Sequence, residues 1–240
     1  MKALIFAAGL GTRLRPITND IPKALVPVGG VPMLERVICK LRDAGIPEFV
    51  VNAYHFADKV SAFLDGHDFG VPTAVSLETG AEPLETGGGI KHAQALLGDG
   101  RFLVHNVDIL SDLDVRWFLS QDRPDALATL LLVDKEADRY LLFDDDMRLV
   151  GWTNVKTGEV KSPYPGFDPS GYRRLSFCGI HIISGEVFDL MEGWPERFGI
   201  IDFYLSVCRE HPIVGVLAED LHLIDIGSPS ALAEANGLFV

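Results

Sequence analysis

Short apolar runs alternate with amphipathic stretches through the first half of the chain. The clearest helix begins at Pro32, because Leu34, Val37, Ile38 and Leu41 share one face of it. The predicted strands are residues 4–7, 48–53, 71–77 and 101–107, and the predicted helices are residues 32–44, 57–64 and 88–97. Apolar strands that alternate with helices predict an α/β fold in which a mainly parallel sheet is flanked by helices.

The second half of the chain has a different pattern, with more strands and shorter helices. The predicted strands are residues 126–133, 140–143, 148–152, 175–183, 213–217 and 221–226, and the predicted helices are residues 187–191, 200–209 and 228–235. The stretch 154–174 is rich in glycine, proline and tyrosine and is expected to be a long irregular loop or insertion. We expect residues 1–240 to form a single domain with a first part of about 1–125 and an accessory part of about 126–240.

Composition limits the partners of this chain. A formal charge of −13 and a pI near 4.9 argue against nucleic-acid binding. The three cysteines, Cys39, Cys178 and Cys208, have no zinc-type spacing, and no apolar stretch approaches a membrane span. The N-terminal apolar run is too short for a secretory leader. We expect a cytoplasmic protein with small-molecule substrates and no membrane partner, as a monomer or small homo-oligomer.

The segment that follows the first strand is built to receive phosphate. It reads AGLGTRLRPITNDIPK from Ala8 to Lys23. Glycines let backbone N–H groups approach anionic oxygens, Arg13 can hold a phosphate with two hydrogen bonds, and Lys23 adds a mobile charge. The Rossmann fingerprint fails because Leu14 stands at its third glycine, and the P-loop motif is absent from the chain. A multiply charged ligand that arrives with a divalent metal suits such a loop.

Two aspartates far apart in the sequence follow predicted strands. Asp108 comes directly after strand 101–107, and Asp225 lies at the end of strand 221–226. Ligands of open α/β sheets bind at the carboxyl ends of strands, and Mg²⁺ prefers oxygen ligands. The pair is therefore a candidate Mg²⁺ site, although Asp108 is also suited to capping a helix that begins near Ser111.

The motifs together resemble those of the sugar-1-phosphate nucleotidyltransferases. The opening segment matches their pattern A-G-x-G-T-R-L-x-P-x-T-x-x-x-P-K at every position, and the segment 82–90, EPLETGGGI, resembles their second nucleotide-contacting loop. Within that family the chain looks most like the N-acetylmuramate-1-phosphate uridylyltransferases. The resemblance implies the Rossmann-like fold of nucleotide-diphospho-sugar transferases with a small accessory lobe. It also implies that residues 1–125 hold the nucleotide and residues 126–240 the sugar.

The resemblance also implies residue roles. Nucleotide contacts are implied for Ala8, Gly9, Gly11, Thr12, Arg13, Glu82, Gly87 and Gly88. Sugar-phosphate contacts are expected from Asn52, Asn106 and Gly179. Catalytic roles are implied for Arg13, Lys23 and Asp108. Mg²⁺ is the implied cofactor, with Asp108 and Asp225 as its ligands. Triple glycine 87–89 is expected at a helix start, where its N–H groups lie at the positive end of the dipole; a turn capped by Thr86 is the alternative.

Several departures leave the substrate open. Val107 and Leu223 replace the usual glycine and tryptophan beside the two aspartates, and the family's Glu-Lys-Pro before strand 175–183 is missing, with Lys156 or Lys161 as candidate replacements. The chain ends soon after Asp225, so no C-terminal β-helix is expected. The alternatives to a uridylyltransferase are a mannose- or heptose-1-phosphate guanylyltransferase, a phosphocholine cytidylyltransferase and a non-catalytic sugar-nucleotide sensor.

Overall fold

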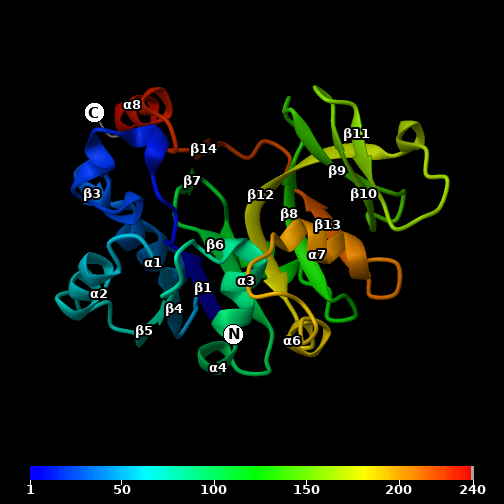
Figure 1. Ribbon diagram of the computed structural model, residues 1–240. Helices are drawn as coiled ribbons and strands as arrows, with labels where there is room; N and C mark the ends of the chain where they lie inside the picture. The colour runs from blue at the N-terminus through cyan, green and yellow to red at the C-terminus, as the bar shows by residue number, and fades with distance from the viewer. Residues whose placement is uncertain (239–240) are drawn as a thin grey trace.

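A ten-stranded sheet runs through the centre of the computed structural model, which describes residues 1–238 (Figure 1). Four parallel strands form its first part, in the order β5 (Thr73–Leu77), β4 (Phe49–Ala53), β1 (Lys2–Phe6) and β6 (Phe102–Asn106). Each lies within two residues of its predicted position. The predicted parallel sheet is confirmed, and it brings the carboxyl ends of β1, β4 and β6 to one edge.

β12 (Arg173–Ile183) joins this parallel part to an antiparallel one, because it runs opposite to β6. It also pairs with β8 (Ala128–Val133), whose parallel neighbour is β13 (Ile213–Leu217). The first residues of β12 pair instead with β9 (Arg139–Phe143), which leads on to β10 (Leu149–Asn154) and β11 (Glu159–Lys161). β9, β10 and β11 form the accessory lobe at the right of Figure 1.

Helices cover both faces of the sheet, as the alternating side chains of β1 require. Ala3 and Ile5 belong to a core that includes residues of α1 (Met33–Asp43), α2 (Ala57–Asp65) and α5 (Val115–Ser120). Leu4 belongs to the opposite core, built with α3 (Glu85–His92), α4 (Gln94–Leu97), α6 (Val187–Leu190) and α7 (Ile200–Val207). Successive strand residues point to opposite faces, so a strand that is apolar throughout needs cover on both sides.

A third, smaller core fixes the opening loop against the C-terminal part of the chain. Leu14 and Met33 are buried there with Ile226 and with Leu232 of α8 (Pro229–Gly237). Two short sheets complete the described strands: β2 (Pro27–Val28) with β3 (Val31–Pro32), and β7 (Ile109–Ser111) with β14 (Leu223–Asp225). None of these sheets is a β-helix, and no helix among residues 1–238 has the length and apolar character to cross a membrane.

Three local predictions are corrected by the structure. α3 begins at Glu85, so the triple glycine lies inside the helix and not at its start. The stretch 154–174 contains β11, which pairs with β10 as a hairpin, and a short 3-10 turn, Pro169–Gly171. The helix after β6 begins only at Val115, and its N-cap is Asp114, not Asp108.

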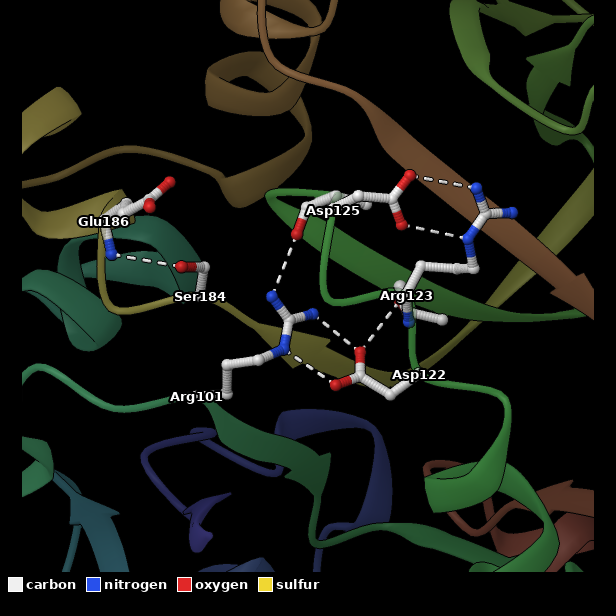
Figure 2. Close-up of polar contacts among 8 residues, drawn as sticks. Arg101, Asp122, Arg123, Asp125, Ser184 and Glu186 are labelled. Carbon is white, nitrogen blue, oxygen red and sulfur yellow. Dashed lines mark hydrogen bonds and ion pairs between the residues drawn. The ribbon is translucent and has the colours of Figure 1, made fainter.

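An arginine–aspartate pair fixes the N-terminal end of β6 (Figure 2). Arg101 donates from Nε and Nη2 to the two carboxylate oxygens of Asp122, at 2.7 and 2.6 Å, and from Nη1 to the Ala126 carbonyl at 2.9 Å. Thr129 of β8 donates to the same carboxylate at 3.1 Å. The pair therefore connects the start of β6 to the segment that leads into β8.

Candidate active site

A pocket of about 430 Å³ opens at the carboxyl ends of β1, β4 and β6. This is the edge at which open α/β sheets bind ligands. The lining includes most of the residues expected from the sequence, namely Ala8, Gly9, Gly11, Thr12, Arg13, Lys23, Asn52, Asn106 and Asp108. The structure therefore brings the opening loop and the first aspartate into one cavity.

The opening loop is held in shape by Gly11 and by the residues around it. Gly11 has a φ of +62°, in the region that favours glycine. Its carbonyl accepts hydrogen bonds from Thr18 Oγ1 at 2.7 Å and from the Leu14 N–H at 2.9 Å. Leu14 is buried, whereas the Arg13 side chain between these positions is 68% exposed. The loop is thus anchored by its apolar residue and presents its arginine at the pocket.

The ribbon of β7 and β14 brings the two candidate metal-binding aspartates together. Asp225 is paired in register with Ile109, the residue after Asp108, and the Ile226 N–H donates to the Asp108 carbonyl at 3.0 Å. Lys23 lies between the carboxylates: Nζ bonds Asp108 Oδ2 and is 3.7 Å from Asp225 Oδ1. The Lys23 side chain is only 10% exposed, so its charge is directed at the two carboxylates.

Gly227 allows these charged groups to crowd together. Its N–H donates to Asp225 Oδ1 at 2.8 Å. A Cβ at this position would lie 2.5 Å from Arg13 Nη2 and 3.0 Å from Lys23 Nζ. Arg13 Nη2 is itself 3.8 Å from Asp225 Oδ2. Arg13, Lys23 and Asp108 therefore line the pocket, and Asp225 lies beside them without lining it.

Glu78 is a buried acid of this pocket that the sequence did not reveal. Asn52 donates from Nδ2 to Glu78 Oε1 at 2.8 Å, and the Leu84 N–H donates to Glu78 Oε2 at 2.7 Å. Both side chains line the pocket, and the buried Asn52 Oδ1 has no hydrogen-bond partner among residues 1–238. A buried orphan acceptor is costly, so Asn52 offers a ready acceptor to a ligand donor.

The glycine-rich segment differs from its expected arrangement. The N–H groups of Gly87 and Gly88 donate to the Phe198 carbonyl, at 2.9 and 3.1 Å. A Cβ at Gly87 would lie 2.3 Å from the Phe198 ring, so the glycine permits close helix packing. The expectation that these N–H groups stand free for a nucleotide is corrected.

The residues around those glycines hold the same segment in place. Arg197 bonds Glu82 and Glu85, each at 2.9 Å, and Glu82 lies outside the pocket lining. Thr86 Oγ1 accepts from the Ile200 N–H at 3.0 Å, so this hydroxyl caps α7 and not a turn of its own. Glu85 and Thr86 are the parts of this segment that line the pocket, together with Pro83.

Gly179 contacts the site through Asn106. It lies where the register between β12 and β8 shifts, with a φ of +72°. A Cβ there would be 2.3 Å from Asn106 Nδ2, so the bare backbone of Gly179 lets this amide sit at the pocket wall. Gly179 itself does not line the pocket.

His105, one residue before Asn106 in β6, is a buried residue beside the site. It is 2% exposed and donates from Nδ1 to the Asn106 carbonyl at 2.7 Å. Burial lowers its pKa to about 4, so the imidazole is neutral near pH 7.

Comparisons with known proteins show the family of this chain. Residues 2–140 match the family described as Nucleotidyl transferase. An N-acetylmuramate alpha-1-phosphate uridylyltransferase of Caulobacter vibrioides is 32% identical over 240 residues, which cover 98% of this chain and 95% of that protein. One of Neisseria meningitidis serogroup B is 36% identical over 242 residues, covering 99% and 98%.

A solved structure is similar along the full length of the chain as well. The crystal structure of HddC from Yersinia pseudotuberculosis superimposes with a TM-score of 0.76 at 25% identity, over 100% of this chain and 99% of that one. Sequence, fold and site lead to one conclusion. The chain belongs to the nucleotidyl transferase family, as a sugar-1-phosphate nucleotidyltransferase.

Proposed function

We propose that this protein transfers UMP from UTP to N-acetylmuramate 1-phosphate, giving the UDP-sugar and pyrophosphate. The choice of sugar and base is supported by two relatives of that printed activity that align with 98% and 99% of this chain. The observation that carries the chemistry is that Arg13, Lys23, Asp108 and Asp225 gather beside Gly227, a residue that lines the pocket.

The reaction needs no protein nucleophile. A phosphate oxygen of the sugar 1-phosphate attacks the α-phosphorus of UTP in line. One P–O bond forms there as the bond from the α-phosphorus to the β-phosphate oxygen breaks, and pyrophosphate leaves with that electron pair. The attacking phosphate is already ionised near neutral pH, so catalysis consists of positioning and of electrostatic stabilisation.

The cationic side chains have separate tasks in this scheme. The exposed Arg13 binds the β- and γ-phosphates and stabilises the departing pyrophosphate. Lys23, held between two carboxylates, offers its ammonium group to the α-phosphate and the sugar phosphate. We place the nucleotide on residues 1–125, with Ala8, Gly9, Gly11 and Thr12 approaching its phosphates, and the sugar on residues 126–240 beyond Asn106.

The two aspartates fit a magnesium ion. Among residues 1–238 no three His, Cys, Asp or Glu side chains gather into a metal-binding group. Mg²⁺ is commonly held by one or two carboxylates and by substrate phosphates, and Asp108 and Asp225 supply such a pair near one lysine. Bound there, the ion would neutralise phosphate charge in the transition state.

The test measures pyrophosphate release in the presence of Mg²⁺. Five nucleoside triphosphates (UTP, GTP, CTP, ATP and dTTP) are each combined with N-acetylmuramate, mannose, glucose and heptose 1-phosphates and with phosphocholine. We expect release with UTP and N-acetylmuramate 1-phosphate and at least about tenfold less with any other pair, a difference of 1.4 kcal/mol in transition-state binding. A blank without sugar phosphate corrects for hydrolysis of the triphosphate.

Each alternative gives a different outcome. Release that requires GTP with mannose or heptose 1-phosphate would contradict the uridylyltransferase assignment and leave the family intact. Release from CTP with phosphocholine would point to a cytidylyltransferase. No release with any pair, together with tight binding of a UDP-sugar, would indicate a sensor.

A further inference from the structure

A second pocket, of about 480 Å³, lies in the accessory lobe between the β9–β10–β11 strands, β12 and α7. Three aromatic side chains line it, Tyr140, Trp152 and Phe177. Two cations, Arg139 and Lys161, line it as well, and so do Glu159 and Asp202. The mechanism above uses none of these residues.

This pocket adjoins the active site through the start of α7. Thr86, which lines the active-site pocket, caps α7 at Ile200, and Ile201 lines the second pocket. A Cβ at Gly199 would lie 3.6 Å from Glu85 Oε2 and 3.7 Å from Asp202 Oδ2. Glu85 belongs to the first pocket and Asp202 to the second, so a single glycine separates their carboxylates.

β12 provides a second connection between the two pockets. Phe177 lines the second pocket, and Gly179, two residues further along the strand, packs against Asn106 in the first. A substrate with its phosphate at the active site can therefore extend along β12 toward the accessory lobe. In Figure 1 β12 passes between the parallel strands and this lobe, with α3 and α7 nearby.

The two cations of the second pocket are not equivalent. Lys161 pairs with Asp202 at 2.9 Å, is 4.0 Å from Glu159, and stands 5.2 Å from the centre of the Trp152 ring. Its charge is therefore already balanced within the protein. The Arg139 side chain makes no hydrogen bond or ion pair with any other residue in 1–238, although it lines the pocket. Lys156, the other candidate for a missing family contact, pairs with Asp138 and lies outside the pocket.

We propose that Arg139 determines sugar specificity by binding a carboxylate on the sugar. This inference rests on the proposed function, because N-acetylmuramate carries a lactyl carboxylate that N-acetylglucosamine lacks. A guanidinium group without a protein partner can form two hydrogen bonds to such a carboxylate. The aromatic side chains beside it offer apolar surface to the sugar ring and its substituents.

The test compares four proteins: wild type, Arg139→Gln, Arg139→Lys and Arg174→Gln. Arg174 is the matched control, since it is an exposed arginine on β12 that does not line the pocket. Steady-state kinetics with UTP are measured separately for N-acetylmuramate and N-acetylglucosamine 1-phosphates. KM and kcat are determined for each sugar, and the KM for UTP serves as a readout of the nucleotide side.

We expect wild type to favour N-acetylmuramate 1-phosphate by at least about 30-fold in kcat/KM, the effect of a hydrogen bond between charged groups. Arg139→Gln raises the KM for that sugar by about the same factor, changes kcat much less and leaves the KM for UTP unchanged. Arg139→Lys recovers part of the preference, because the charge remains while the two-bond geometry is lost. Arg174→Gln behaves as wild type.

Failure of this inference and failure of the proposed function look different. If wild type uses N-acetylmuramate 1-phosphate and Arg139→Gln keeps its KM and its preference, the role of Arg139 is refuted while the function stands. An equal loss in Arg174→Gln also refutes it, since general charge would then be the cause. If wild type releases pyrophosphate only with a neutral sugar phosphate, both the proposed function and this inference are overturned.

Discussion

Two clusters of opposite charges flank β6, one before the strand and one after it. At the N-terminal end, Arg101 and Asp122 form a two-bond ion pair, and their side chains are 20% and 12% exposed. At the C-terminal end, Lys23 is shared between Asp108 and Asp225, while Arg13 is 3.8 Å from its nearest carboxylate. We call the pair of Arg101 and Asp122 the closed cluster. We call the group formed by Arg13, Lys23, Asp108 and Asp225 the open cluster.

The difference lies in whether the charged groups are satisfied by the protein. Each nitrogen of the Arg101 guanidinium has an acceptor, and Thr129 adds a donor to the Asp122 carboxylate. At the other end, Arg13 is largely exposed and Asp225 is 48% exposed. A saturated cluster holds the fold together, whereas an unsaturated one leaves charged groups for the phosphates and the metal ion that the proposed function requires.

The largest expected effect on activity comes from removing the negative charge of Asp225. Asp225→Asn keeps the oxygen that accepts from the Gly227 N–H but removes the negative charge, so kcat should fall by about 1,000-fold, since a bound metal ion contributes several kcal/mol. Pyrophosphate release measures this, with Asp145→Asn on an exposed turn as the control. Full activity in Asp225→Asn would contradict the proposed role of this carboxylate in holding Mg²⁺.

A smaller loss of activity is expected from Arg13→Ala. Loss of one cation that stabilises the leaving group should cost about 2–4 kcal/mol of transition-state stabilisation, by analogy with an oxyanion-hole donor. The thermal midpoint should stay within about 2 °C, because the side chain is mostly exposed. Arg15→Ala, also exposed but outside the pocket, is the matched control; equal losses in both variants would contradict a specific role for Arg13.

The closed cluster should respond in the opposite way. Arg101→Met leaves the Asp122 carboxylate buried without its ion partner, which should lower the free energy of unfolding by about 3 kcal/mol. The kcat of the folded fraction should not change, since Arg101 lies at the far end of β6 from the pocket. Urea unfolding and pyrophosphate release, measured on one preparation, check both statements. An unchanged free energy of unfolding would show that the ion pair of Arg101 and Asp122 does not stabilise the fold.

The smallest expected effect concerns His105, which lies in β6 between the two clusters. Its folded pKa of about 4 is below the ordinary value of 6.5, so the unfolded chain binds the extra proton first as pH falls. The stability from burying the neutral ring is present above pH 6.5 and is lost as pH falls toward 4. The expected slope is about 1.4 kcal/mol per pH unit.

His181, whose pKa burial lowers to about 3, adds a similar slope. His105→Gln should remove only its own share, as measured by urea unfolding between pH 4.5 and 6.5. An unchanged slope would mean that His105 does not titrate as a buried residue. If His105→Gln retains its kcat at pH 7.5, His105 contributes to stability and not to catalysis, as the closed cluster does.

Much of the fold could be predicted because the hydrophobic pattern and burial agree. β1, β4 and β6 each contain an unbroken run of buried apolar residues, namely 3–5, 49–51 and 102–104, which indicates a strand covered on both faces. β11 was missed because all three of its residues are exposed, so no alternation marks it. The start of α3 was misplaced because glycine is a poor helix former, and packing of Gly87 against Phe198 outweighs that propensity here.

The site could be predicted where residues are close in sequence or follow a strand. The opening motif pointed to Arg13 and Lys23, and the ends of two predicted strands pointed to Asp108 and Asp225. Glu78 also follows a predicted strand but was missed, because no motif marks it and only its hydrogen bond with Asn52 places it in the pocket. Arg197 was missed too, since its bonds to Glu82 and Glu85 span more than a hundred residues.

The most direct test compares Asp108→Asn with Asp122→Asn, two isosteric changes at the opposite ends of β6. Pyrophosphate release and urea unfolding are measured for both proteins and for wild type. We expect Asp108→Asn to lose turnover and to lose less unfolding free energy than Asp122→Asn, because Asp225 remains 3.7 Å from the Lys23 ammonium group and still balances its charge. Asp122→Asn should be destabilised by about 3 kcal/mol and keep its kcat when folded. Retained turnover in Asp108→Asn would contradict the assignment of the open cluster as the active site.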